Sequence, residues 1–396
     1  MKSLQIAKTH RIKIVILAFL LNYVGQFGID VYLPSMPNMQ HAFNTNSAHI
    51  KLTIGVYLIG MGFGQFIFGF LADRFGRRAS LMTGAIGFSA MSFILLFSHT
   101  IVSFLVWRFL QGFFVTAGMV VGRVVSRDLF ESKQLMKISS YLTALWAMIP
   151  VFAPMIGGYI QEYLGWHMNF IVIFVLSLIV TTMIYLLFPE TKPSNDEHPY
   201  DNFYQGLRHV LRNKLFVFCL LNASFGSAYI FAYNAISAFL LQVNLHLLPS
   251  TFGWIAFSMA SFILLGSFSN AQLLNHFSRK RLIYTSYGFI TVASIVLLTL
   301  ALTASLSILT VAIPVAIVFF ASMLNYPNFS GSSYGSLNKY RGIGTAVYGT
   351  VQLAVCGLLT VFTVLLPTHS ATGLAILFLI FVAIQALLVI PIRKQL

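Results

Sequence analysis

The chain has 396 residues, of which 58% are hydrophobic and only 8% are charged, and its mean hydropathy is +0.84. A water-soluble domain carries about a quarter charged residues, so the composition excludes a soluble enzyme or binding module and indicates a protein that crosses a membrane many times. The two cysteines lie in separate apolar segments, and no histidine pair has metal-ligand spacing. A disulfide framework and a metal site are therefore not expected.

Twelve segments are apolar over the roughly 20 residues that a membrane-crossing helix needs. The runs are continuous rather than alternating, which predicts helices and not a transmembrane barrel. We predict spans at 12–33, 50–71, 79–98, 101–122, 138–160, 168–188, 215–242, 252–274, 282–302, 306–325, 343–366 and 370–392. The predicted fold class is an all-α membrane protein with two six-helix bundles, at residues 1–188 and 215–396, joined by a cytoplasmic linker at 189–214.

The positive charges follow the predicted topology. Of the 24 Lys and Arg residues, 22 lie at the termini or in loops on one side of the twelve spans, and only Lys51 lies on the other side. Positive residues accumulate on the cytoplasmic side of membrane proteins, so both termini are predicted to be cytoplasmic. The net charge of +15 is thus a topology signal, and no soluble basic face that could bind nucleic acid is expected.

The first span carries a polar stripe. Asn22, Gln26 and Asp30 are spaced by four residues and share one helix face. A polar stripe facing lipid is unfavourable, so this face should point into the bundle. The fourth span contributes Arg108, about seven residues or roughly 10 Å from the same membrane surface. After Asp201 the chain has no acidic residue, so a carboxylate that carries protons must come from the first half.

These charges suggest a proton-coupling pair. Burial disfavours an ionised carboxyl group, and a nearby cation favours it. A carboxyl group held between the two effects can change protonation as its surroundings alternate. We hypothesise that Asp30 takes a proton from outside and releases it inside, while Arg108 tunes Asp30 or holds the first span in place. The alternatives are that Asp30 is a helix end in contact with water and that Arg108 is a structural tie to backbone carbonyls.

Four stretches in the first 160 residues resemble the major facilitator superfamily, and within it the Bcr/CflA-like drug:proton antiporters. They are DVYLPSMP at 30–37, GFLADRFGRR at 69–78, WRFLQGFFVTAGMVVGRVVSRDLF at 107–130, and PVFAPMIGG at 150–158, which has Ala153 where the family usually has Gly. The resemblance implies a multidrug efflux antiporter of the bacterial inner membrane that contributes to antibiotic resistance. It also implies a monomer that binds a small molecule within the lipid bilayer, with the proton as coupling ion and no other cofactor.

The motifs supply candidate gating residues, each with a physical reason. Gly69 would let another helix pack closely, and Asp73 would hydrogen-bond the amino terminus of a neighbouring span, which in the family holds the inside closed. The arginines have a topogenic alternative, and ordinary helix packing is the alternative for the Pro and Gly residues of 150–158. The gating set is Gly69, Asp73, Arg74, Gly76, Arg77, Arg78, Arg127, Asp128, Pro154, Gly157 and Gly158.

The halves show a weak internal repeat and a separate set of substrate candidates. DRFGRR at 73–78 matches NHFSRK at 275–280, as parallel repeats would. Substrates in this fold bind near the midplane between the halves, where aromatic and Met side chains suit partly apolar ligands; ordinary packing is the alternative role. The candidates are Asn22, Gln26, Asp30, Tyr141, Met148, Asn222, Tyr229, Tyr233, Tyr348 and Gln352.

Other functions fit less well. The same fold and the same Asp30 would also serve an importer, or a carrier for a metabolite or siderophore. An integral membrane enzyme lacks support, because no acids or histidines cluster and no nucleophile motif is present. A channel is disfavoured by the loop motifs. The sequence does not define the substrate, the direction of transport or the proton stoichiometry.

Overall fold

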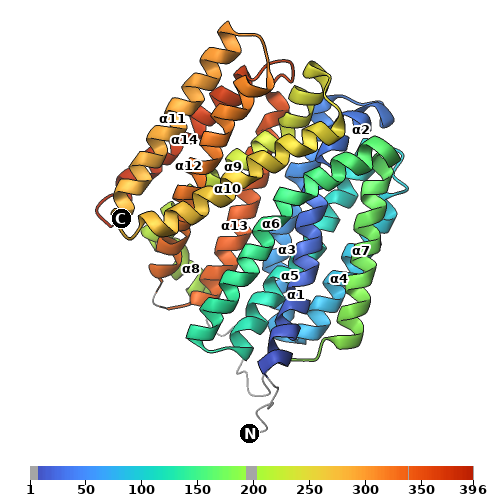
Figure 1. Cartoon of the computed structure of the whole chain (residues 1–396). Coiled ribbons are helices and arrows are strands. Elements are labelled where there is room, and N and C mark those ends of the chain that lie inside the picture. Colours follow the sequence, from blue (N-terminus) through green and yellow to red (C-terminus); the bar gives the residue numbers. More distant parts are fainter. Residues whose placement is uncertain (1–7, 193–202, 338, 396) are drawn as a thin grey trace.

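The computed structural model describes residues 8–192, 203–337 and 339–395, and within these ranges the chain contains helices and no strand. Twelve of the helical segments are long and apolar enough to cross a membrane. The predicted all-α membrane fold with twelve spans is therefore confirmed. Figure 1 shows the segments from blue to green packed as one group and those from yellow to red as another.

The first half of the chain supplies six spans and a short helical cap. The elements are α1 (Lys8–Asp30), η1 (Leu33–Ser35), α2 (Met36–Ala42), α3 (Ser47–Phe75), α4 (Arg77–Leu95), α5 (Ile101–Leu129), α6 (Ser132–Leu164) and α7 (Trp166–Leu187). We call the end at which α1 begins the basic end, and the opposite end, which carries α2, the far end (Figure 1).

The second half repeats this plan after a short helix. The elements are α8 (Phe203–Arg212), α9 (Lys214–Ala238), the π-helical turn η2 (Phe239–Val243), α10 (Pro249–Leu273), α11 (Arg279–Thr303), α12 (Ile308–Gly335), α13 (Arg341–Val361), η3 (Phe362–Leu365), α14 (Thr372–Val389) and η4 (Ile390–Ile392). Arg77 and Arg279, which correspond in the internal repeat, each begin the helix that follows the second span of their half.

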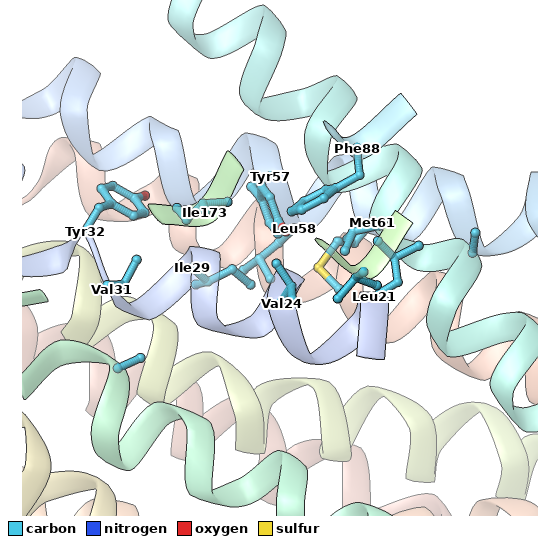
Figure 2. Packing of buried hydrophobic residues seen from close by; sticks show 14 of the residues in the cluster. Leu21, Val24, Ile29, Val31, Tyr32, Tyr57, Leu58, Met61, Phe88 and Ile173 are labelled. Carbon is cyan, nitrogen blue, oxygen red and sulfur yellow. The ribbon is translucent and has the colours of Figure 1, made fainter. Parts of the chain in front are cut away.

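The core of the first bundle surrounds α1. Leu21 and Ile29 of α1 are buried together with Tyr57 of α3, Phe88 of α4 and Ile173 of α7, and Figure 2 shows these side chains gathered along α1. The helix packs through its apolar residues on several sides, and Asp30, at its end, lines the cavity between the bundles. This packing fixes the rotation of α1 and therefore the direction in which Asp30 points.

The two bundles meet most closely at the far end. A Cβ atom added to Gly158 of α6 would overlap the carbonyl of Pro249 at the start of α10, and one added to Gly253 would lie 2.8 Å from the carbonyl oxygen of Pro154. In Figure 1, α6 and α10 cross near the far end and diverge toward the basic end. The structure is therefore closed between the bundles at the far end.

Several helices extend beyond their predicted spans, and α12 shows why. The segment 306–325 was expected to end before a polar stretch, whereas α12 continues to Gly335. Its polar residues remain helical because they bond inside the bundle: Asn328 Nδ2 donates to Asn270 Oδ1 at 2.7 Å and to the backbone carbonyl one turn earlier. A hydropathy profile predicts the end of the span at the first polar cluster, because it contains no information on hydrogen bonds to other helices.

The linker is not entirely a plain connector. Residues 193–202 lie outside the described part of the chain, but residues 203–212 form α8. Val210 of α8 is fully buried in the core of the second bundle. The part of the predicted linker that is described therefore begins with an extension of the first bundle and ends as a helix docked on the second.

Candidate functional site

Asp30 is the last residue of α1 and is almost completely buried, with 1% of its surface exposed. Gln26 Nε2 donates a hydrogen bond of 2.7 Å to Asp30 Oδ2, as their spacing of one helical turn allows. Asn22, the third member of the predicted stripe, is also buried. A carboxyl group in this position is far from the open water that a helix end at the membrane surface would meet.

A cavity lies beside Asp30, between the bundles. Asp30 and Pro154 line it from the first bundle, and Tyr233, Asn234 and Ser237 of α9 line it from the second. Its remaining wall is apolar and comes mainly from α10. The carboxyl group of Asp30 is thus the only acidic side chain in the lining of this cavity within the described residues, and it faces neutral hydroxyl and amide groups.

Arg108 is completely buried in the first bundle. Its guanidinium carbon lies 4.5 Å from the ring centroid of Tyr32 and 4.4 Å from that of Tyr57, so the cation sits between two aromatic faces. Arg108 Nη1 donates to Gln111 Oε1 at 2.7 Å, and both terminal nitrogens reach the carbonyl of Gly28 at 3.4 Å. These contacts tie α5 to α1 just before Asp30.

Within the described residues Arg108 and Asp30 do not form an ion pair with each other, whereas Arg77 pairs with Asp73 and Asp128. Tyr57 packs against Arg108, and its hydroxyl donates to the carbonyl of Gly25 on α1 at 3.0 Å. The geometry fits a role for Arg108 in holding the end of α1 and acting on Asp30 through neighbouring groups. Sequence reasoning missed both aromatic residues: Tyr57 lies in no motif, and Tyr32, although it belongs to the stretch DVYLPSMP, was not assigned a role.

The candidates on α9 fall into two groups. Tyr233 reaches the cavity beside Asp30. Tyr229 Oη donates to Gln385 Oε1 of α14 at 2.8 Å, and Asn222 Oδ1 accepts from Tyr287 of α11 at 2.7 Å. Asn222 and Tyr229 therefore face the interior of the second bundle and not the space between the bundles. The face of α9 that they share with Tyr233 is wide, so one edge of it contacts α11 and α14 while the other reaches the cavity.

The remaining substrate candidates lie nearer the basic end. Gln352 of α13 donates to the hydroxyl of Tyr326 at 3.0 Å, and the ring of Tyr348 lies 4.6 Å from that of Tyr334. Tyr348 is buried, Gln352 and Tyr326 are partly buried and Tyr334 is 36% exposed, so these residues form a partly open polar cluster in the second bundle. Tyr141 and Met148 of α6 are 62% and 47% exposed, so in this conformation their side chains are not packed in the protein interior.

The turn between α3 and α4 is built around Gly76, whose φ of +94° favours glycine. Arg77 is buried and its Nε donates to Asp128 Oδ2 at 3.1 Å, which joins the turn to the end of α5. Asp73 Oδ1 lies 3.8 Å from Arg77 Nη1. The structure thus brings Asp73, Gly76, Arg77 and Asp128 together at the basic end.

Glu190 is a residue of this cluster that sequence reasoning missed. Its carboxylate accepts hydrogen bonds from the backbone N–H groups of Arg77 and Arg78 at the start of α4, at 2.9 and 3.1 Å. It also accepts from the N–H groups of Thr191 and Lys192. Glu190 therefore occupies the amino terminus of α4, where a negative charge is favoured. The signal was an acid placed directly after the sixth span.

The pH dependence of this contact follows from its bonds. Partial burial alone would raise the pKa of Glu190, but the four backbone N–H groups outweigh it and hold the pKa below its ordinary value. The contact therefore contributes stability above the unfolded-state pKa, and this is lost as the pH falls through the lower folded-state value. We expect Glu190→Gln to destabilise the protein by about 1 kcal/mol at neutral pH and to match wild type at low pH, as measured by thermal unfolding. Equal melting temperatures at neutral pH would contradict the assignment.

The other gating candidates at the basic end have different surroundings. A Cβ atom on Gly69 would meet nothing within 4 Å, so the expectation that Gly69 permits close helix packing is wrong for this conformation, in which no neighbour approaches that side of α3. Arg74 lies 5.4 Å from the ring centroid of Phe75, and Arg78 donates to the carbonyl of Tyr185 at 2.9 Å. Arg127 is exposed at the end of α5.

Glycines of α6 create the close contacts at the far end. A Cβ on Gly157 would overlap the carbonyl of Val31, directly after Asp30, and one on Gly158 would overlap that of Pro249. Pro154 lines the cavity. This segment of α6 therefore touches the end of α1 on one side and the opposite bundle on the other. Movement of one bundle relative to the other therefore changes the packing beside Asp30.

Lys51 supplies a second contact between the bundles at the far end. It lies on α3 and is 1% exposed. Its Nζ donates to the carbonyls of Thr363 and Leu366 at 3.1 and 2.7 Å. The ammonium group therefore satisfies carbonyls at the end of a helix in the other bundle, where a cation is favoured. In the sequence, Lys51 is conspicuous as the single positive residue predicted on that side.

We expect Lys51→Met to loosen the far end, because Met preserves bulk but cannot donate hydrogen bonds. A hydrogen bond from a charged group contributes about 1.5–3 kcal/mol, so opening should become at least about tenfold more frequent. The measurement is the rate at which a water-soluble maleimide labels a Ser237→Cys variant; both native cysteines are buried. Lys51→Arg, which keeps the donors, is the control. Equal labelling rates for Lys51→Met and wild type would refute this role.

The fold and the site define a membrane transporter: two helical bundles, closed at one end, with a buried carboxyl group beside a cavity between them. The chain belongs to the Major Facilitator Superfamily, whose family profile matches residues 15–360. It is 26% identical over 344 residues to a bicyclomycin resistance protein homolog of Haemophilus influenzae, which covers 85% of each chain. It is 30% identical over 273 residues, 68% of each chain, to the multidrug resistance protein MdtL of Shewanella oneidensis.

Solved structures show the same fold. The xylose transporter XylE from E. coli, in a partially occluded inward-open conformation, matches with a TM-score of 0.76 at 14% identity and covers 98% of each chain. A bacterial homolog of the human lysosomal transporter Spinster, in an inward-facing and unoccupied conformation, matches with a TM-score of 0.70 at 15% identity, over 97% of this chain and 96% of the other.

Proposed function

We propose that this protein is a proton-coupled antiporter of the bacterial inner membrane that exports drug-like or amphipathic small molecules by alternating access. The observation that carries the proposal is the buried carboxyl group of Asp30 at the edge of the cavity between the bundles. The similarity of the chain to drug resistance proteins supports drug-like molecules as the class of substrate. The protein would act as a monomer, and no cofactor besides the proton is invoked.

Alternating access would couple the movement of the proton to that of the exported substrate through Asp30. The carboxyl group binds a proton when the far end is open to the outside, because a neutral acid is favoured once the cavity closes around it. When the basic end opens, substrate and water replace that apolar surrounding and the proton leaves. Arg108 holds the end of α1 through Gly28, so the position of Asp30 follows the movement of α5.

The cavity wall supports a partly apolar substrate. Met259, Phe252 and Phe319 line it together with prolines of α6, while Tyr233 and Asn234 provide polar groups. Methionine and aromatic side chains adapt to ligands of several shapes, and a small number of polar groups fixes orientation. This combination favours amphipathic molecules over strongly hydrated ones such as sugars.

The proposed topology places the basic end in the cytoplasm, since 22 of the 24 basic residues belong to the termini and loops that the sequence assigns to that side. On that topology the structure is in the inward-facing state, closed at the far end. Both termini are then cytoplasmic, and the cluster around Arg77 and Glu190 lies on the cytoplasmic side. Glycosylation or labelling reporters fused to the termini would check the orientation.

Transport in proteoliposomes tests the function. Purified protein is reconstituted, a pH gradient is imposed, and a panel of amphipathic cations, neutral drugs, sugars and iron chelates is screened for uptake. We expect saturable uptake of amphipathic compounds into vesicles that are acidic inside, which is the direction of proton exchange. Uptake only into vesicles acidic outside would instead indicate symport, as expected for an importer of a metabolite or siderophore.

A further inference from the structure

Helix α8 is fixed to the second bundle by one of its faces. A Cβ atom on Gly206 would overlap the side chain of Ile343 on α13, and the ring of His209 lies 5.6 Å from that of Tyr340. Val210 is completely buried. The helix is therefore a docked element with a defined orientation, and its outward face is equally defined.

That outward face carries an aromatic, a basic and an apolar side chain in line. Tyr204, Arg208 and Leu211 are spaced by four and three residues, so they lie above one another on the helix. Tyr204 is 76% exposed and Leu211 is 50% exposed, and Arg212 is exposed beside them. Such a stripe is typical of helices that lie at a membrane surface, where rings and aliphatic chains enter the headgroup layer and cations meet phosphates.

The second half carries a large excess of positive charge at the basic end. Residues 202–396 contain ten Lys and Arg residues and no Asp or Glu. All ten belong to the basic end, at α8, at the starts of α9, α11 and α13, or at the carboxyl terminus. Neither Arg208 nor Arg212 has an ion-pair partner within the described residues. Residues 202–396 therefore hold no acidic side chain that could balance these cations, and an anionic lipid surface can supply the opposite charge.

The position of α8 places it next to the membrane. The helix ends at Arg212, and the membrane-crossing α9 begins at Lys214, with only Asn213 between them. Asn213 anchors this corner, because its Nδ2 donates to the carbonyl of Ser336 at 3.0 Å and its Oδ1 accepts from Phe216 N at 3.1 Å. A ten-residue helix is about 15 Å long, so all of α8 stays within reach of the headgroup layer.

We propose that the outward face of α8, with Tyr204, Arg208, Leu211 and Arg212, is a binding site for anionic phospholipid headgroups. The arginines contact phosphate groups, and Tyr204 and Leu211 insert between the lipids. Since α8 packs on Tyr340 and Ile343 beside the start of α13, a bound lipid also anchors the basic end of that helix. The proposal does not depend on which solute the protein transports.

Lipid binding is measured on the full-length protein in neutral detergent, by titrating phosphatidylglycerol and counting adducts by native mass spectrometry. Each basic residue near an anionic surface contributes about a fivefold gain in affinity. Arg208→Gln/Arg212→Gln should therefore weaken the tightest adducts by about thirtyfold. Lys13→Gln/Lys137→Gln, which removes two exposed cations from the first bundle, is the charge-matched control and should bind like wild type. Equal weakening in both double variants would show a general charge effect and overturn the site.

A second readout examines the stripe directly. Leu211→Cys is labelled with a water-soluble maleimide in vesicles of phosphatidylcholine alone and in vesicles containing equal parts of phosphatidylglycerol. We expect slower labelling in the anionic vesicles, because the side chain is covered by lipid. Equal and fast labelling in both would overturn the proposal and leave this face to an acidic protein in solution.

Discussion

Asp30→Asn is expected to abolish uphill transport while the protein still binds and exchanges substrate. Asn keeps the size of the side chain and can remain hydrogen-bonded to Gln26, which donates to Asp30 at 2.7 Å, but it cannot take up or release a proton. A pH difference of one unit supplies about 1.4 kcal/mol per proton, or about tenfold accumulation. Wild-type vesicles should reach this level for each proton exchanged, and the variant should stop at equal concentrations.

Counterflow separates a lost proton site from a lost fold. In counterflow, labelled substrate exchanges with unlabelled substrate without any gradient, so Asp30→Asn should still perform it. Glu162→Gln is the matched control, because Glu162 is also a carboxylate toward the far end, where it accepts from the backbone N–H of Ser250 at 3.2 Å. This control should retain uphill transport. If Asp30→Asn concentrates substrate as well as Glu162→Gln does, Asp30 is not the proton carrier.

The second large effect is expected at the contact between the bundles. Gly158→Val places a branched side chain where a single Cβ atom would already overlap the carbonyl of Pro249. Because the obstacle is backbone and not a flexible side chain, the far end cannot close without moving α10. Overpacking of this kind amounts to about 1–3 kcal/mol, so the closed state should lose about tenfold or more of its population and transport should slow accordingly.

Distances across the far end measure this shift. Spin labels at Tyr163→Cys on α6 and Leu248→Cys before α10 occupy exposed positions in opposite bundles. The distance distribution should move to longer values in Gly158→Val. Gly288→Val is the control, since a Cβ there meets nothing within 4 Å, and it should leave the distribution unchanged. Identical distributions for Gly158→Val and wild type would show that this contact does not set the closed state.

Much of the fold could be predicted because lipid leaves few choices. A run of apolar residues long enough to cross a bilayer must be helical, and the twelve predicted spans correspond to twelve observed helices. The ends of the helices are harder to predict from the sequence: α12 runs ten residues beyond its predicted end at 325. Asn328 is satisfied by Asn270, and a contact between distant parts of the chain does not register in local hydropathy.

Apart from Tyr233 and Pro154, which line the cavity, the site was predictable mainly where a charge stood out. Asp30, Arg108 and Lys51 are conspicuous in an apolar chain, and the structure gives each a specific buried setting. What each one touches depends on helix rotation, so the aromatic sandwich around Arg108 could not be read from spacing. The same limit applies to Tyr229, which the sequence places on the same helix as Tyr233 but which the fold directs into its own bundle.

Proton release on substrate binding tests the central claim most directly. Purified protein in weakly buffered detergent solution is mixed with a transported compound, and the pH change is followed with an indicator dye. Wild type should release protons on addition of the compound, because substrate displaces the proton held at Asp30, and Asp30→Asn should bind the compound without any release. Equal release from both proteins would mean that the coupling proton is carried elsewhere.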